Sequence, residues 1–150
     1  MSRASVDRLW VSGQIVLIAL VVVAAILGRH WPGRPALLVV GIVAVVLGGL
    51  TMVWGGRTLG RLLTPYPSPR GAHLERGPYR FVRHPMYGGG IVLALGFSLA
   101  SSPWALVPTA ALVPFFLLKA HYEEGLIVAA DPSYGDYLGR VRRRFFPGLL

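Results

Sequence analysis

The sequence predicts an all-α integral membrane protein with about four transmembrane helices and a cytoplasmic C-terminal helical part. Three observations lead to this fold class. Hydrophobic residues make up 54% of the 150 residues, and the mean hydropathy of +0.59 is high for a soluble domain of this length. Basic residues are concentrated on the side of the membrane that both termini would share. Four apolar segments are long enough to cross a bilayer, or nearly so, at residues 9–27, 36–54, 86–101 and 104–118. A chain of this length is expected to form one domain, spanning residues 1–150.

The first apolar segment, residues 9–27, is almost free of polar residues. Only Ser12 and Gln14 interrupt it, both near its start. About 20 apolar residues are enough to cross a bilayer, so the segment is predicted to be a transmembrane helix. A cleaved signal peptide is the alternative, because Arg3 and Arg8 precede the segment. The absence of a clear small-residue cleavage site and the presence of further apolar segments favour the helix.

The next three apolar segments predict a second span and a helical hairpin. Small residues allow helices to approach closely in membranes, so the glycines of the second segment are predicted to pack against a neighbour. These glycines are Gly41, Gly48 and Gly49. The third segment, 86–101, is short for a full span. The turn Ser101-Ser102-Pro103 separates it from the fourth, 104–118, so the two are expected to pair as a tight hairpin.

The distribution of charge predicts the topology. An even number of spans places the N-terminus, the long connection 55–85 and the C-terminal part on one side. That side carries 13 of the 15 Lys and Arg residues, and the other side has only Arg29 and Arg34. The positive-inside rule therefore predicts that both termini are cytoplasmic, in the cell (inner) membrane. The formal net charge of +9 fits anionic membrane lipid as the partner, and nucleic acid is not expected.

The C-terminal part is predicted to be helical. The fourth segment is expected to continue as a helix to residue 130, where Asp131-Pro132-Ser133 ends it. Residues 134–146 have apolar and aromatic side chains at helical spacing and a run of arginines. This pattern predicts an amphipathic helix lying on the membrane surface.

Polar residues cluster at both ends of the predicted hairpin. Residues 77–90 combine Arg, His, two Tyr, two Pro and four Gly directly before an apolar segment. Lys119 and Glu123 follow the fourth segment and share one helix face, since they are four residues apart. A hairpin brings its ends together, so Arg83 and His84 are expected to lie near Glu123. Cations, carboxylates and aromatic rings at one membrane surface favour a site for a zwitterionic cofactor that carries adenine.

These motifs resemble a known family. They are Gly77-Pro78-Tyr79, the run Arg83-His84-Pro85-Met86-Tyr87-Gly88, Glu123-Glu124, Tyr134-x-x-Tyr137 and the ending Phe146-Pro147. The chain is similar over residues 62–147 to the isoprenylcysteine carboxyl methyltransferase and phospholipid methyltransferase group of integral membrane enzymes. The resemblance implies transfer of a methyl group from S-adenosylmethionine, with S-adenosylhomocysteine as product. The acceptor would be lipidic or a small hydrophobic molecule.

The resemblance also implies roles for individual residues. It places the cofactor elements at residues 71–90 and 119–147. Cofactor binding is implied for His73, Leu74, Tyr79, His84, Pro85, Met86, Tyr87, Gly88, Glu123 and Glu124. A catalytic role is implied for Arg83, Glu123 and Lys119. Lys119 stands where the methyl-ester-forming members have Arg near the acceptor, so acceptor recognition is expected to differ here.

The chemistry leaves the acceptor open. Methyl transfer is an in-line displacement, and alignment of the two reactants supplies much of the rate. Arg83 can orient a carboxylate through paired hydrogen bonds. An amine or a thiol needs a base, for which Glu123, Glu124 and His84 are candidates.

Two other functions compete with methyl transfer. One is a membrane reductase of related fold that uses a nicotinamide cofactor, and the other is a non-enzymatic lipid-binding scaffold. The sequence has no cysteine, so disulfides and thiolate chemistry are excluded. No His and carboxylate set has the spacing of metal ligands, and no metal is expected.

Overall fold

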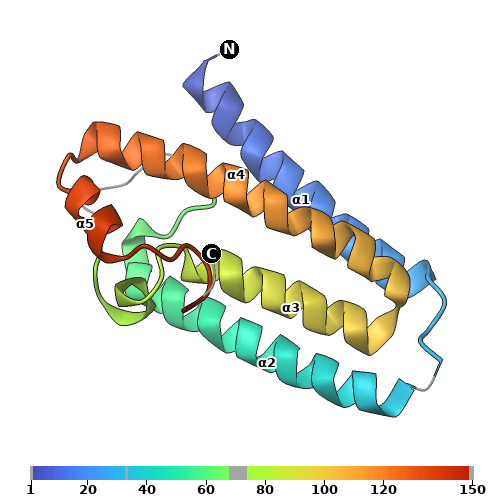
Figure 1. The fold of residues 1–150 in the computed structure, drawn as a ribbon. Coiled ribbons are helices and arrows are strands. Elements are labelled where there is room, and N and C mark those ends of the chain that lie inside the picture. Colours follow the sequence, from blue (N-terminus) through green and yellow to red (C-terminus); the bar gives the residue numbers. More distant parts are fainter. Residues whose placement is uncertain (1, 33, 68–73, 149–150) are drawn as a thin grey trace.

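The computed structural model describes residues 2–32, 34–67 and 74–148. Its regular elements are helices, arranged as a bundle with a short helix at one end (Figure 1). The main elements are α1 (Arg3–Leu27), α2 (Arg34–Leu59), α3 (Pro85–Ser101), α4 (Leu106–Ala130) and α5 (Tyr134–Arg140). Three short 3₁₀ helices join them: η1 (Gly60–Leu62), η2 (Gly77–Arg80) and η3 (Pro103–Ala105). The predicted all-helical architecture is confirmed.

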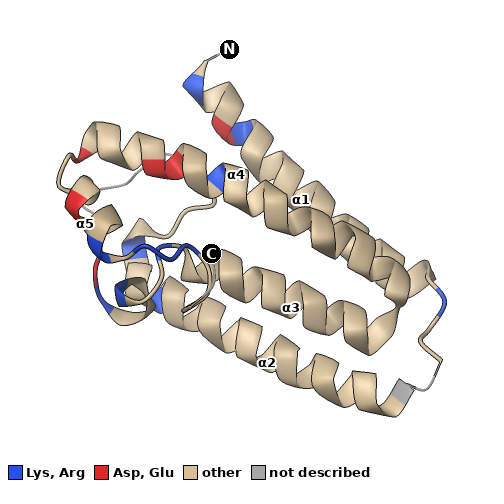
Figure 2. Cartoon of the chain, in the orientation of Figure 1, with Lys and Arg blue, Asp and Glu red and all other residues tan. Residues whose placement is uncertain are grey.

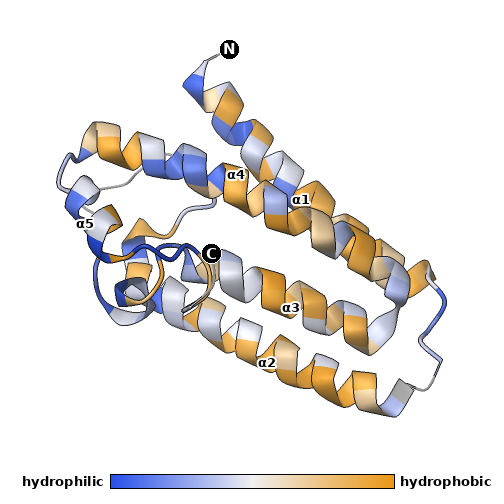
Figure 3. Ribbon diagram, in the orientation of Figure 1, coloured by the Kyte–Doolittle hydropathy of each residue, from blue (hydrophilic) through white to orange (hydrophobic). Residues whose placement is uncertain are grey.

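Within the described residues, three stretches are long and apolar enough to cross a membrane: Arg3–Leu27, Pro35–Leu62 and Pro103–Ala130. The third predicted segment forms α3, which has 17 residues and is a shorter apolar helix. Apolar residues run along the middle of all four long helices, and hydrophilic residues take over at the end near α5 (Figure 3). The outer faces of α1 and α2 are exposed and apolar, as expected for surfaces that contact lipid.

α2 and α3 pack closely because the glycines at their contact have no side chains that would hold the two helices apart. A Cβ atom built on Gly48 would lie 2.5 Å from the carbonyl oxygen of Gly89, and one on Gly96 would lie 2.6 Å from that of Gly41. The predicted packing role of Gly41 and Gly48 is therefore confirmed. The same prediction is wrong for Gly49, since a Cβ atom there would meet nothing within 4 Å. Adjacent helical residues point about 100° apart, so only one of the two glycines faces α3.

Gly48→Ala is expected to destabilise the fold by about 1–3 kcal/mol, because the added methyl group clashes with backbone atoms that cannot move aside. Gly49→Ala is the matched control and is expected to be neutral or slightly stabilising, since Ala favours helix more than Gly. Thermal unfolding of both variants in the same detergent checks this. Equal melting temperatures for the two variants would contradict the close contact.

α1 lies on the other side of the bundle from α2. It packs against α3, α4 and η3, whereas α2 packs mainly against α3. Among the described residues, α1 and α2 barely touch. α3 and α4 bound the space between α1 and α2, and the cavity described below lies in this space.

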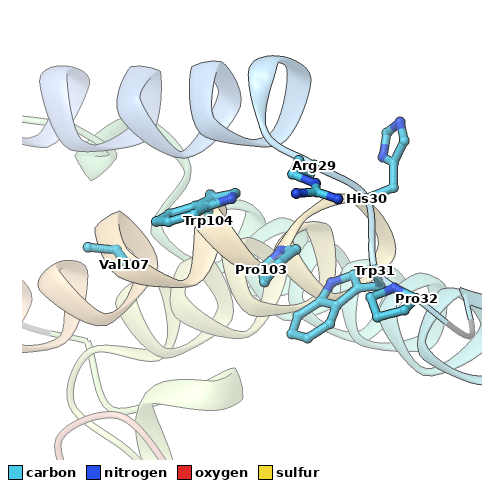
Figure 4. Close-up of a pocket in the computed structure, with 7 residues that line it drawn as sticks. All are labelled: Arg29, His30, Trp31, Pro32, Pro103, Trp104 and Val107. Atoms are coloured by element: carbon cyan, nitrogen blue, oxygen red, sulfur yellow. The ribbon is translucent and has the colours of Figure 1, made fainter.

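Charged residues gather at one end of the bundle. Figure 2 shows them on the last turns of α4, on α5 and the segment after it, and at the start of α1. Near the opposite end a pocket of about 590 Å³ is lined by residues of the α1–α2 connection and by η3 and the start of α4 (Figure 4). There the Trp31 indole nitrogen donates to the Ser98 carbonyl at 3.1 Å, and His30 Nδ1 lies 3.1 Å from the Ser101 carbonyl. These contacts tie the connection to the end of α3.

The predicted helix 134–146 is wrong beyond Arg140. α5 ends at Arg140, and Val141 leaves the helical region with φ −104° and ψ 84°. The chain then runs alongside the segment before α3. The amides of Arg83 and His84 donate to the carbonyls of Arg143 and Arg144, at 2.9 and 2.7 Å. These two amides have no hydrogen-bond acceptor within a helix. The extended chain after Arg140 supplies their acceptors, which a continuing helix would not do.

Candidate active site

The loop before α3 places the run Arg83-His84-Pro85 at the start of this helix. Gly77 begins η2 with φ +58°, a backbone conformation that favours glycine, and a Cβ atom there would also meet the Thr58 hydroxyl at 2.5 Å. His84 is the residue before the first turn of α3, and Pro85 occupies the first helical position, which proline favours. The C-terminal segment fixes the backbone of Arg83 and His84 from the other side.

The two ends of the α3–α4 hairpin meet, as the sequence predicts. The Tyr87 hydroxyl donates to Glu123 Oε1 at 2.5 Å, and His84 Nδ1 lies 3.6 Å from Glu123 Oε2. The rings of His84 and Tyr87 stack with centroids 5.4 Å apart, and Tyr87 stacks on Phe116 at 4.6 Å. Glu123 is thus held between α3 and α4, with its carboxylate at the cavity wall.

Glu124 is the centre of an ion-pair network. Its Oε1 lies 3.1 Å from Arg83 Nε and 3.1 Å from His84 Nε2, and its Oε2 accepts from Arg144 Nη2 at 3.0 Å. The Arg83 Nε–H is not directed at the oxygen, so that contact is an ion pair without a hydrogen bond. The network joins the loop before α3, α4 and the C-terminal segment. Glu124 therefore holds the site together and does not itself line the cavity.

Lys119 lies deeper in the bundle, one helical turn before Glu123. Its side chain is buried, at 1% exposure. The ammonium donates to the amide oxygen of Gln14 at 2.6 Å and to the carbonyl of Pro65 at 3.1 Å. It also lies 5.2 Å from the centroid of the Tyr87 ring, within the range of a cation–π contact.

A cavity of about 780 Å³ runs through the bundle from this site. Its polar end is bounded by side chains of η2, α4 and α5 and by the loop before α3. Its apolar end is bounded by α1 to α4, with Val21, Phe97 and Leu112 among the lining residues. Along α3 the lining runs from Met86 to Phe97, which corresponds to about 16 Å of helix. One space thus connects a charged, aromatic end with a hydrocarbon-lined end.

The structure brings most of the expected site residues to this cavity. It is lined by Leu74, Tyr79, Arg83, His84, Met86, Tyr87, Lys119 and Glu123. Pro85, Gly88 and Glu124 do not line it. A Cβ atom on Gly88 would lie 2.5 Å from the Phe145 carbonyl oxygen, so this glycine makes room for the C-terminal segment. His73 lies outside the described residues.

Three buried tyrosines complete the polar end, and two of them, Tyr134 and Tyr137, come from α5. The Tyr137 hydroxyl donates to the Tyr79 carbonyl at 2.6 Å, which ties α5 to η2. Burial raises the pKa of Tyr79, Tyr134 and Tyr137, so these phenols stay protonated and neutral. They provide aromatic faces and hydroxyl groups without adding charge.

Sequence reasoning missed Gln14 as a site residue. It comes from α1, about a hundred residues before Lys119 in the chain, and it lines the cavity. The only available signal was its polarity within an apolar segment, which Ser12 shares although Ser12 is exposed. Only the packing of α1 on α4 distinguishes the two residues.

The comparisons with known proteins support the reading of the motifs. The family of phospholipid methyltransferases matches residues 36–129, from α2 to the end of α4. No individually curated protein matches the chain at a significant level. α1 and the segment from α5 onward lie outside the matched residues. Because the match covers more than half of the chain, and because its motifs meet around one cavity between apolar helices, this protein belongs to the phospholipid methyltransferase family of membrane methyltransferases.

Proposed function

We propose that the protein transfers a methyl group from S-adenosylmethionine to a lipidic acceptor at the cytoplasmic face of the inner membrane. The observation that carries the proposal is the single cavity with a charged, aromatic end and an apolar end. A water-soluble cofactor and a membrane-borne acceptor have to meet in one space, and this cavity is suited to both. Its volume is also within the usual range for ligand pockets, about 300–1,000 Å³.

The residues at the polar end fit the cofactor. Tyr79, Tyr134 and Tyr137 offer aromatic faces for adenine. Glu123 offers a carboxylate for the ammonium or the ribose hydroxyls. No described residue accepts a hydrogen bond from the two terminal nitrogens of Arg83, which are therefore available to a bound carboxylate. When bound, S-adenosylmethionine supplies a methyl group activated by the positive sulfur.

The protein contributes alignment and exclusion of water. The stacked rings of Tyr87 and Phe116 form part of the cavity wall where its polar end meets its apolar end. A carboxylate acceptor would be oriented by Arg83 or Lys119. An amine or thiol acceptor would give its proton to a base, for which Glu123 and His84 are the candidates that line the cavity. Holding the two reactants in line supplies much of the rate.

The apolar end fits a lipid chain. Since α1 and α2 barely touch, a chain in the membrane can enter between them and contact Val21, Met52 and Phe97. We place α3 in the membrane with the three longer helices, which gives four spans. The charged end of the bundle in Figure 2 then faces the cytoplasm with both termini.

Calorimetry with S-adenosylhomocysteine tests the cofactor. The purified protein in neutral detergent is expected to bind it in the micromolar range. Glu123→Ala and His84→Ala are each expected to weaken binding at least about tenfold, the cost of losing a polar contact in a buried site. His121→Ala is the matched control, because His121 lies on α4 but is exposed.

Three outcomes distinguish the competing functions. Binding that is lost in the two site variants supports the methyltransferase, and transfer of labelled methyl to a total membrane extract then identifies the product. Binding of NADPH without S-adenosylhomocysteine would indicate a reductase. Failure to bind either cofactor would indicate that the protein is a lipid-binding scaffold without enzymatic activity.

A further inference from the structure

Lys119 is a buried cation whose described partners are neutral. It donates to an amide oxygen and a backbone carbonyl, which use two of its three N–H groups. Among the residues that the structure describes, no carboxylate forms an ion pair with it. A buried ionisable residue is costly, and its charge is normally compensated by a partner. The third N–H and the lack of an ion pair with a described residue both suit a ligand in the cavity.

The surrounding charges point to an anionic ligand. The basic groups at or next to the polar end of the cavity are Arg83, Arg144 and Lys119, against the carboxylates of Glu123 and Glu124. Glu124 pairs with both arginines, and Glu123 is engaged by Tyr87 and His84. Among these basic groups, Lys119 is the one that forms no ion pair with a described carboxylate, and a cofactor carrying a positive sulfur would add further positive charge.

The position of Gln14 is fixed by packing of α1 on α4. A Cβ atom on Gly13 would lie 2.9 Å from the Phe115 ring, so glycine lets the two helices approach. Trp10 packs against Phe115 and Tyr122, with ring centroids 5.4 and 5.9 Å apart. These contacts aim Gln14 at Lys119. The neutral amide at position 14 holds the ammonium in place and does not neutralise its positive charge. A carboxylate at the same position would neutralise that charge.

We propose that Gln14 positions Lys119 to bind an anionic oxygen group of the acceptor, a carboxylate or a phosphate carried on an apolar chain. Lys119 lies between the polar end at Glu123 and the apolar end at Phe116 and Leu112. An anionic group held there leaves its chain in the apolar part of the cavity. The inference rests on the proposed methyl transfer, because it assigns the acceptor side of the same cavity. It makes α1, which lies outside the residues that match the family, a determinant of acceptor choice.

Binding of amphiphiles with one chain and different head groups tests the inference. The probes are decanoate, decyl phosphate, decanol and decylamine, titrated into the full-length protein in neutral detergent. The wild-type protein is expected to bind decanoate or decyl phosphate at least about tenfold more tightly than decanol or decylamine, the size expected for a charged hydrogen bond in a buried site. Preference for decanoate indicates a carboxylate acceptor, and preference for decyl phosphate indicates the phosphate of a phospholipid.

Gln14→Glu is the decisive variant. If Gln14 had only a structural role, the Gln14→Glu variant would keep the preference for the anions, since glutamate can also accept a hydrogen bond from Lys119. Our inference predicts that the preference for the anions disappears, because the new carboxylate neutralises the ammonium. Lys119→Met is the second variant, and it is expected to remove the same preference even if Gln14→Glu does not fold. Ser12→Ala, on the exposed face of α1, is the control and should behave as wild type.

Three results would overturn the inference. They are equal binding of decanol and both anions to the wild type, an unchanged preference in Gln14→Glu, and loss of S-adenosylhomocysteine binding in Lys119→Met. The last would mean that Lys119 contacts the cofactor and not the acceptor. Absence of S-adenosylhomocysteine binding to the wild type would instead refute the proposed methyl transfer, and the anion preference would still report on Gln14 and Lys119.

Discussion

Glu124→Gln is expected to destabilise the protein by about 3–5 kcal/mol, the usual effect of removing one partner from a buried ion pair. The glutamine keeps the size of the side chain but not its charge. Arg83 and Arg144 would then be left close together without a counter-charge. Since these residues join the loop before α3 to the C-terminal segment, the wall of the cavity is expected to loosen as well.

The neighbouring substitution provides the contrast. Glu123→Gln changes the same group one residue earlier, but Glu123 faces the cavity and has Tyr87 and His84 as its partners. It is expected to lose cofactor binding while keeping most of its stability. Thermal unfolding and S-adenosylhomocysteine titration, run on both variants in one detergent, separate the two roles. If Glu124→Gln unfolds at the wild-type temperature, the network is not what holds the segments together.

Arg83→Lys is expected to fold normally and to lose about a hundredfold in turnover, a typical result of misplacing a reactant in the site. Lysine preserves the charge next to Glu124, which lies 3.1 Å from Arg83 Nε. It replaces a planar fork with a single point charge, so it cannot hold a carboxylate through two parallel hydrogen bonds. Single-turnover transfer of labelled methyl to membrane extract measures the loss.

The melting temperature is the control for Arg83→Lys. A variant that melts as the wild type but turns over slowly locates the defect in the site. Full activity in a stable Arg83→Lys protein would show that the guanidinium fork has no role in the reaction. A large fall in melting temperature would show instead that Arg83 acts mainly through Glu124.

The sequence determined the helical architecture and indicated where along the chain the candidate site lies. Apolar segments with few interruptions leave only helices as stable elements in lipid, because every backbone polar group has to be satisfied internally. A hairpin of two such segments brings its ends together, so the proximity of His84 to Glu123 followed from the order of the segments alone, whereas Arg83 pairs with Glu124. The motif in residues 77–90 pointed to the family that the chain matches.

Tertiary structure decided which of the clustered residues face the cavity. Glu123 and Glu124 are adjacent in sequence, but the helix turns one toward the cavity and the other toward the arginines. The helix expected for residues 134–146 ends at Arg140, because the unpaired amides of Arg83 and His84 bind the chain beyond it. Gln14 reaches Lys119 only through the packing of α1 on α4. Local pattern predicted the long helices, whereas the end of α5 and the contacts between residues distant in sequence depend on tertiary packing.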